Sequence, residues 1–122
     1  MDMTLLKICP GQKPELVTMP NTLDALQEAV GGSIQAIYPY DDPVALICNE
    51  EGMLLGLEPN RALRCEETGG IYDILCGTFL ICGLGLEDFT SLPKPLAEKY
   101  ARKFQSPELM LWNGQRLVII PL

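Results

Sequence analysis

Residues 71–84, with the sequence IYDILCGTFLICGL, form the longest nearly uncharged apolar run in the chain, and Asp73 is its one charged residue. When the run is divided with a period of two residues, both faces are apolar, which is typical of a central strand covered on both sides. We therefore expect one central strand, in which Gly77 marks a bulge or a close backbone approach. The run is too short and too interrupted by glycine to cross a bilayer as a helix, which needs roughly 20 apolar residues.

The length and composition predict one folded domain, residues 1–122. A chain of 122 residues can bury roughly two-thirds of the surface that its unfolded form exposes. A hydrophobic content of 48% with 20% charged residues argues against intrinsic disorder. The first residues lack a basic region followed by a long apolar core, so no signal peptide is visible and we expect a cytoplasmic protein.

The five cysteines show no Cys-x-x-Cys spacing, so the sequence predicts neither a disulfide framework nor a zinc ribbon. Reduced thiols are expected. Cys76 and Cys82 would lie about 20 Å apart on the expected strand, too far for a disulfide. Cys65 precedes Glu66 and Glu67, whose negative charge disfavours a thiolate.

The first half of the chain predicts hairpins and one helix. We expect strands at residues 4–9, 15–19 and 33–38, a helix over 23–30 that begins after Asn21 or Thr22 and ends at Gly31-Gly32, and a second hairpin from 44–48 through the turn 49–52 into 53–55. Residues 56–63 predict a turn and one helical turn. The central strand follows.

The second half predicts an amphipathic helix and a closing hairpin. Leu92, Leu96, Tyr100 and Phe104 recur every four residues, in a helix that Ser91 caps, with Pro93 or Pro95 in its first turn. Asn113-Gly114 predicts a two-residue turn between strands at 109–112 and 115–120. Together these elements describe an α+β fold, a mainly antiparallel sheet built from hairpins with two main helices packed on it.

Eight short pieces follow one another in a specific order: NTLDALQ at 21–27, VGG at 30–32, YP at 38–39, DD at 41–42, NEEG at 49–52, NRA at 60–62, YDI at 72–74 and GTF at 77–79. In this order they resemble an uncharacterised family of small acidic bacterial proteins, a domain of unknown function common in phages and conjugative elements. The resemblance covers roughly residues 4–104, and we take residues 1–106 as the family-like part and 107–122 as a hairpin extension. It implies an accessory role on mobile DNA and supplies no catalytic residues.

Conventional catalytic chemistry has no support in the sequence. The chain contains no histidine, which removes Ser-His-Asp and Cys-His catalysis and the commonest zinc ligands. It has no phosphate-binding Gly-x-x-x-x-Gly-Lys loop, and Gly83-Leu84-Gly85 is not a complete dinucleotide fingerprint. We therefore expect no catalytic residues, no metal, no cofactor and no enzymatic activity.

Asn60 and Arg61 are the first candidates for a binding site. A loop that places a planar guanidinium beside an amide can hold a carboxylate or phosphate with two parallel hydrogen bonds. The alternative is structural: Asn60 caps a turn, and Arg61 pairs with Glu58 or another acidic neighbour.

A second group of candidates lies in the turns around residues 38–51. Two phenols can line a cleft, and clustered carboxylates can bind a hard divalent cation. The alternatives are a core position for Tyr38, which alternates with Ile34 and Ala36, and solvated turns for the acids. These candidates are Tyr38, Tyr40, Asp41, Asp42, Glu50 and Glu51.

The net charge of −7 is concentrated in the middle of the chain, where residues 41–88 hold ten acidic and two basic residues. Such a surface repels DNA and anionic membranes, so we expect a protein partner with a basic surface. The sequence assigns no oligomeric state. The predicted function is that of a non-enzymatic accessory protein of a phage or mobile element, which binds a macromolecule through its acidic surface, for example as an anti-defence protein or a DNA mimic. The alternative is a small-ligand binding module built from the Asn60-Arg61 loop and the 38–42 loop.

Overall fold

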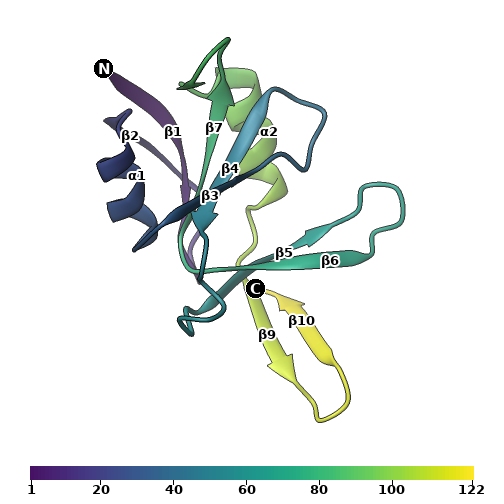
Figure 1. The fold of residues 1–122 in the computed structure, drawn as a ribbon. Coiled ribbons are helices and arrows are strands. Elements are labelled where there is room, and N and C mark those ends of the chain that lie inside the picture. Colours follow the sequence, from purple (N-terminus) through teal and green to yellow (C-terminus); the bar gives the residue numbers. More distant parts are fainter.

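A computed structural model describes residues 1–122, and its main element is an antiparallel sheet with the strand order β2-β1-β7-β4-β3 (Figure 1). A short strand, β8, pairs with the end of β7. The bounds are β1 Asp2–Ile8, β2 Glu15–Pro20, β3 Ile34–Ile37, β4 Val44–Asn49, β7 Phe79–Leu84 and β8 Phe89–Thr90. Every strand pair is antiparallel.

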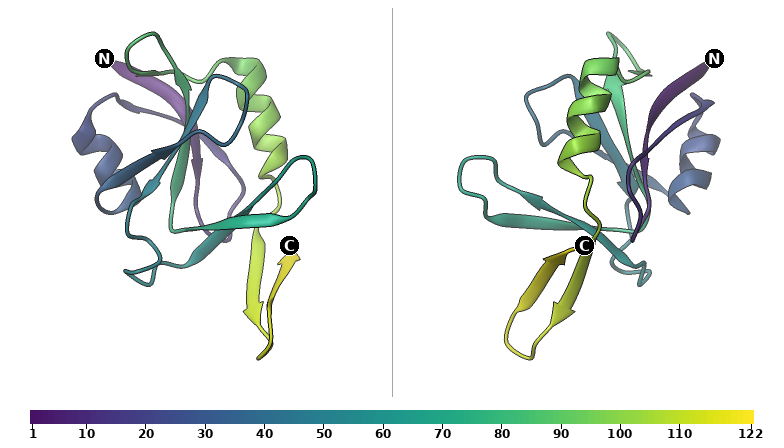
Figure 2. Two further views of the ribbon diagram at one scale, coloured as in Figure 1. Left: turned by 45° about the vertical axis from the view of Figure 1, so that its right-hand side comes forward. Right: turned by 180° about the vertical axis from the view of Figure 1, so that it is seen from behind.

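Two helices, α1 (Leu23–Val30) and α2 (Lys94–Lys103), cover opposite faces of this sheet (Figure 2). Alternate residues of the central strands divide between two apolar clusters. Phe79 and Ile81 of β7 pack with Tyr100 of α2 in one cluster. Leu80 of β7 packs with Leu26 of α1 in the other. The predicted α+β fold, with a mainly antiparallel sheet and two helices on it, is confirmed.

The predicted single strand over 71–84 is wrong, because the chain turns sharply at Gly77. Residues before the break form β6 (Ile71–Cys76), which leaves the main sheet and pairs with β5 (Pro59–Arg64) as a separate hairpin (Figure 1). Gly77 has φ 83°, a conformation in which any residue with a side chain is strained. A Cβ there would also lie 2.8 Å from Leu57 Cδ1, so the Leu57 side chain would have to move. Only β7 is the expected central strand with both faces buried. Cys76 and Cys82 therefore lie on different strands.

The segment between β4 and β6 also differs from the prediction. Residues 51–56 form turns rather than the second strand of a hairpin, with a helical-type bond from Leu55 N–H to Glu51 O of 2.8 Å. The expected helical turn at 56–63 is instead mostly strand β5. The partner of β5 is β6, which lies later in the sequence, so no local pattern indicates this pairing.

The two helices begin in different ways. Thr22 caps α1 by accepting a 3.2 Å hydrogen bond from Ala25 N–H, and Gly31 ends it in the left-handed conformation at φ 79°, as predicted. Ser91 does not cap α2, whose N-cap is Pro93 and has no side-chain bond. The Ser91 hydroxyl instead accepts a 2.9 Å bond from Thr4 N–H, which ties the entry of α2 to β1.

The closing hairpin consists of β9 (Glu108–Trp112) and β10 (Leu117–Pro121) and projects from the rest of the molecule (Figure 2). We call these two strands the C-terminal ribbon. The hairpin is confirmed, but its predicted two-residue turn is wrong, because Trp112 pairs with Leu117 and four residues connect the strands. The Asn113 side-chain oxygen shapes this loop by accepting bonds from the N–H groups of Gln115 and Arg116.

Candidate functional site

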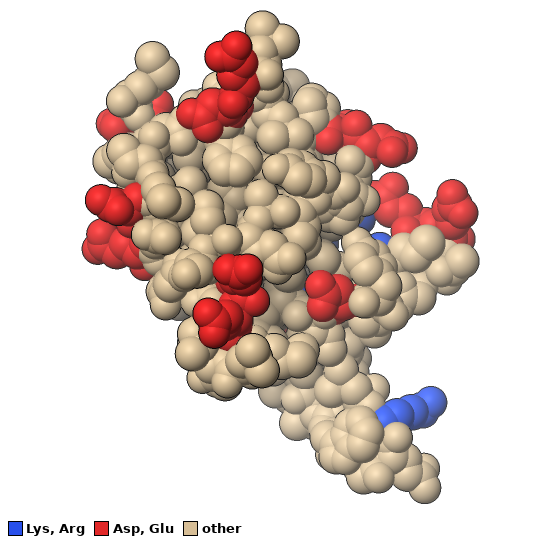
Figure 3. Space-filling view, in the orientation of Figure 1, with Lys and Arg blue, Asp and Glu red and all other residues tan.

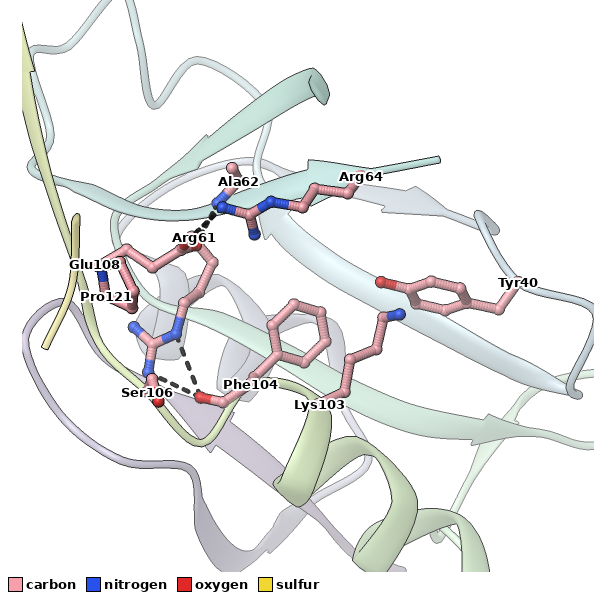
Figure 4. Close-up of a pocket in the computed structure, with 9 residues that line it drawn as sticks. All are labelled: Tyr40, Arg61, Ala62, Arg64, Lys103, Phe104, Ser106, Glu108 and Pro121. Atoms are coloured by element: carbon pink, nitrogen blue, oxygen red, sulfur yellow. Dashed lines mark hydrogen bonds and ion pairs between the residues drawn. The ribbon is translucent and has the colours of Figure 1, made fainter. Parts of the chain in front are cut away.

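A hollow of about 350 Å³ lies where the β5–β6 hairpin, the end of α2 and the base of the C-terminal ribbon meet (Figure 4). We call it the junction cavity. Segments far apart in the sequence supply its walls. The lining residues are Tyr40, Arg61, Ala62, Arg64, Lys103, Phe104, Ser106, Glu108 and Pro121.

Arg61 is 1% exposed, and all five of its N–H groups are engaged within the protein. Nε and Nη2 donate to the Phe104 carbonyl at 3.2 and 3.0 Å, and Nη2 also donates to the Gln12 carbonyl at 2.6 Å. Nη1 donates to Asn60, at 2.7 Å to the side-chain oxygen and 3.4 Å to the carbonyl. The guanidinium therefore joins β5 to the end of α2 and to the β1–β2 loop.

Asn60 is fully buried and links β5 to the main sheet. Its Nδ2 donates to the carbonyls of Ile8 and Gly77 at 2.8 and 2.9 Å. Asn60 and Arg61 thus lie on a strand and not in a loop, so the predicted loop placement is wrong. The turn cap and the ion pair with Glu58 are wrong as well, because none of the three salt bridges involves Arg61. Burial lowers the pKa of Arg61, and the nearby Glu108 opposes that shift.

Glu108 anchors the ribbon to β5. Its side chain is 7% exposed, and its two oxygens accept separate bonds, from Ala62 N–H at 2.8 Å and from Arg64 Nη2 at 2.6 Å. Glu108 is the one carboxylate of the ribbon, and an isolated acid in an apolar hairpin was the available sequence signal for this anchor. The sequence interpretation missed it, together with Arg64, Lys103 and Phe104.

Tyr40 forms the opposite wall of the junction cavity, beside Lys103 (Figure 4). The Lys103 ammonium lies 5.0 Å from the Tyr40 ring centroid, and Nζ is 3.4 Å from Glu66. Tyr40 also packs on Tyr100 with 5.1 Å between ring centroids. Burial, with smaller effects from nearby Tyr72 and Glu66, raises the pKa of the Tyr40 phenol.

A second hollow, of about 530 Å³, shares Tyr40 and Arg64 with the junction cavity and so adjoins it. Its other lining residues are Pro39, Asp41, Cys65, Glu66, Glu67 and Tyr72. Tyr38 lines neither hollow and is 60% exposed, so the alternative that placed it in the core is wrong.

The candidate carboxylates on the two sides of β4 do not form one cluster. Asp42 accepts bonds from Lys99 Nζ at 2.6 Å and Tyr100 Oη at 2.7 Å, and these two bonds, the first more strongly, lower the pKa of its carboxyl. Asp41 and Asp42 precede β4, whereas Glu50 and Glu51 follow its other end. No group of three or more His, Cys, Asp or Glu residues is arranged to hold a metal ion.

Cys65 has the opposite pKa shift from the one expected. Hydrogen bonds from Thr68, first from its backbone N–H and then from its hydroxyl, lower the pKa of the thiol. Glu66 raises it, as the sequence suggested, but by less. The local turn therefore outweighs the adjacent charge.

This site belongs to a small α+β protein whose most buried polar groups hold the structure together. Residues 3–105 match the family described as a domain of unknown function, DUF3846, and the chain belongs to this family. Comparisons with curated proteins and with solved structures gave no match. The C-terminal ribbon lies beyond the matched residues. No helix of the structure has the length and apolar character needed to span a membrane.

Proposed function

We propose that this is a non-enzymatic binding protein, whose acidic surface contacts a macromolecule with a basic surface. The supporting observation is the large number of carboxylates without a cation. Of sixteen acidic residues only Asp42, Glu66 and Glu108 form ion pairs, so thirteen form none. On the face shown in Figure 3, acidic groups are numerous and Lys and Arg are scarce.

The position of these acids favours recognition at long range. Many lie in turns that project from the strands, at residues 41–42, 50–51, 66–67 and 87–88. On the face shown in Figure 3, the acidic groups lie in separate places rather than in one dense patch. At physiological ionic strength, salt screens a charge beyond about 8 Å. Within that distance the negative charges attract a cationic surface and increase the rate of encounter with it.

The partner in this proposal is a cytoplasmic DNA-binding protein, and the setting is a phage or mobile element. The setting rests on the resemblance described above. The class of partner rests on charge: a basic DNA-binding surface attracts negative groups, because that is how it attracts phosphates. Occupying that surface would make the protein an inhibitor of DNA binding, such as an anti-defence protein.

Charge reversal tests the proposal. The double variants Glu50→Lys/Glu51→Lys and Glu66→Lys/Glu67→Lys are compared with the wild type as bait in a lysate of the native host. A matched control is Glu15→Lys/Glu98→Lys, which makes the same change in net charge on β2 and α2, outside the four acidic turns.

We expect the wild type and the control to capture a basic protein that the variants at residues 50–51 and 66–67 do not capture. The association rate should also fall as salt rises, while thermal stability changes little, because exposed charges contribute little to folding. Association rates that stay equal across all variants and salt concentrations would rule out an electrostatic interface.

A second candidate, a small-ligand binding module, is favoured by the two adjoining hollows. Tyr40, Tyr72 and Arg64 line them, which offers two phenol rings and a cation to a planar ligand. Arg61 and Asp41 also reach these walls, whereas Asn60, Tyr38 and Asp42 do not. Screening a fragment library by NMR tests this: shifts confined to Tyr40, Arg64 and Tyr72, and lost in Arg64→Ala, would support it, whereas no such shifts would exclude it.

A further inference from the structure

The C-terminal ribbon is apolar on both faces although it projects from the body of the protein. Leu109, Leu111 and Ile120 are 43%, 47% and 41% exposed on one face, and Trp112 is 69% exposed on the other. A two-stranded hairpin in water is marginally stable by itself, and three or more strands are generally needed. The ribbon therefore has the properties of an incomplete sheet.

The outer edge of the ribbon is β10, which pairs only with β9. Two hydrogen bonds, one at each end of the ribbon, show which opposite residues form hydrogen-bonded pairs. Asn113 N–H donates to Arg116 O at 3.1 Å, and Leu122 N–H donates to Pro107 O at 2.7 Å. Since bonded and non-bonded pairs alternate in an antiparallel ladder, Val118 and Ile120 direct their backbone groups toward β9. Leu117 and Ile119 consequently direct theirs away from it.

Apart from the proline at its end, this edge lacks the features that normally prevent strands from pairing. Edge strands are commonly protected by charged residues, bulges or proline. β10 has the sequence LVIIP, with no charge and no break in register, and its proline is the last residue. Ile119, at its centre, presents both a free donor and a free acceptor.

We propose that two copies of the chain pair through β10, in antiparallel orientation about a two-fold axis at Ile119, to give a four-stranded sheet β9-β10-β10-β9. In this register Ile119 lies opposite Ile119 of the second copy, and Leu117 lies opposite Pro121. The two Ile119 residues exchange two hydrogen bonds, and each Leu117 N–H donates to a Pro121 carbonyl. The missing N–H of proline therefore removes none of these four bonds.

Charge at this edge does not oppose a second copy, and the self-complementary register fits one. Two chains of net charge −7 repel each other over most of their surface, but residues 109–122 contain no acidic side chain, and Arg116 is their one charged side chain. The antiparallel arrangement also places the two bodies at opposite ends of the joined ribbons. A five-residue strand is about 17 Å long, so this arrangement keeps the acidic loops of the two copies apart.

The oligomeric state of the full chain tests the proposal. Light scattering during gel filtration should give a mass twice the 13.5 kDa of one chain. Ile119→Pro removes the outward N–H without removing a bond to β9, and should raise the dimer dissociation constant about 30-fold, the effect of losing two hydrogen bonds. Ile119→Ala is the matched control, because it shortens the side chain but retains the N–H, and should change the constant less than about tenfold.

Hydrogen exchange of the wild type provides a readout that does not depend on how the variants fold. The amides of Leu117 and Ile119 should be protected at high protein concentration and should exchange quickly at low concentration. A monomer at every concentration, with fast exchange at both amides, would overturn self-pairing and would leave the edge for a strand of another protein. A dimer that Ile119→Pro and Ile119→Ala weaken equally would overturn edge pairing in favour of contact through the faces.

Discussion

Replacing Arg61 by alanine removes the donors that three segments of the chain share. Four acceptors lose a bond, namely the carbonyls of Phe104, Gln12 and Asn60 and the side-chain oxygen of Asn60. An unsatisfied buried acceptor costs about 1–3 kcal/mol, and water entering the junction cavity keeps each cost near about 1 kcal/mol. Removing the guanidinium also relieves the desolvation that lowers its pKa, which offsets part of the loss.

The expected net loss is about 2–4 kcal/mol of the free energy of unfolding, a large share of the total for a domain of this size. Urea unfolding at neutral pH measures it. With a slope of about 2 kcal/mol per molar urea, the midpoint should fall by about 1–2 M. Arg61→Lys keeps the charge but cannot reproduce the planar fork, so its midpoint should lie between those of the wild type and Arg61→Ala.

The matched control is Arg102→Ala, which removes an exposed arginine of α2 that forms no salt bridge. It should change stability by less than about 0.5 kcal/mol. An arginine in a loop, which is where the sequence places position 61, would behave in the same way. If Arg61→Ala and Arg102→Ala unfold at the same urea concentration, the structural role assigned to the Arg61 guanidinium is refuted.

Three further outcomes are expected. Phe79→Ala should lower the free energy of unfolding by about 3–5 kcal/mol in the same urea assay, because Phe79 is fully buried and packs edge-on against the Phe104 ring at 5.4 Å; a loss below 1 kcal/mol would contradict this. Tyr100→Phe should cost about 1 kcal/mol at pH 7 through the lost bond to Asp42. The pKa of Asp42 is lowered in the folded protein, so the bond stabilises the wild type fully above the unfolded pKa of about 3.9, and this stabilisation is lost as pH falls through the folded pKa. The urea midpoints of the wild type and Tyr100→Phe should therefore converge in acid. A difference that stays constant with pH would exclude Asp42 as the cause. Thiol titration of denatured, unreduced protein should find all five cysteines, and fewer would contradict the expectation of reduced thiols.

Sequence reasoning succeeded where the signal was local. A capping threonine and a left-handed glycine define both ends of α1, and both act within one turn of the helix. The β1–β2 and β9–β10 hairpins likewise pair segments that are close in sequence. Such elements depend on neighbouring residues, so their patterns are visible in the sequence without knowledge of the fold.

The break at Gly77 could not be seen in the same way. A run that is apolar with period two shows that residues favour strands, but it does not show where the chain changes partner. The residues before Gly77 pair with β5 and are largely exposed, whereas those after it are buried in the main sheet. The sequence predicts a bulge or a close backbone approach at Gly77. Whether the chain bulges or turns a corner there depends on Leu57 and Glu58, which contact this glycine.

Arg61 shows why the candidate site could not be predicted from the sequence. In sequence it is a charged residue near a proline and an asparagine, which suggests a turn. Its burial becomes tolerable only because carbonyls 43 and 49 residues away converge on its donors. Nothing in the local sequence encodes that convergence, because it results from the packing of α2 and the β1–β2 loop against β5.

The residues around the junction cavity join the two parts of the molecule for which we propose a function, the acidic surface and the edge of β10. Arg61 and Asn60 hold β5 against the main sheet, and Glu108 holds the C-terminal ribbon against β5. The β5–β6 hairpin carries the acidic turn at residues 66–67, and the ribbon carries the unpaired edge of β10. Because both hairpins project from the same few buried hydrogen bonds, those bonds fix the angle between the acidic surface and the edge. A residue such as Arg61, whose donors are all used internally, therefore orients these two surfaces, and this is the role we propose for it in place of contact with a ligand.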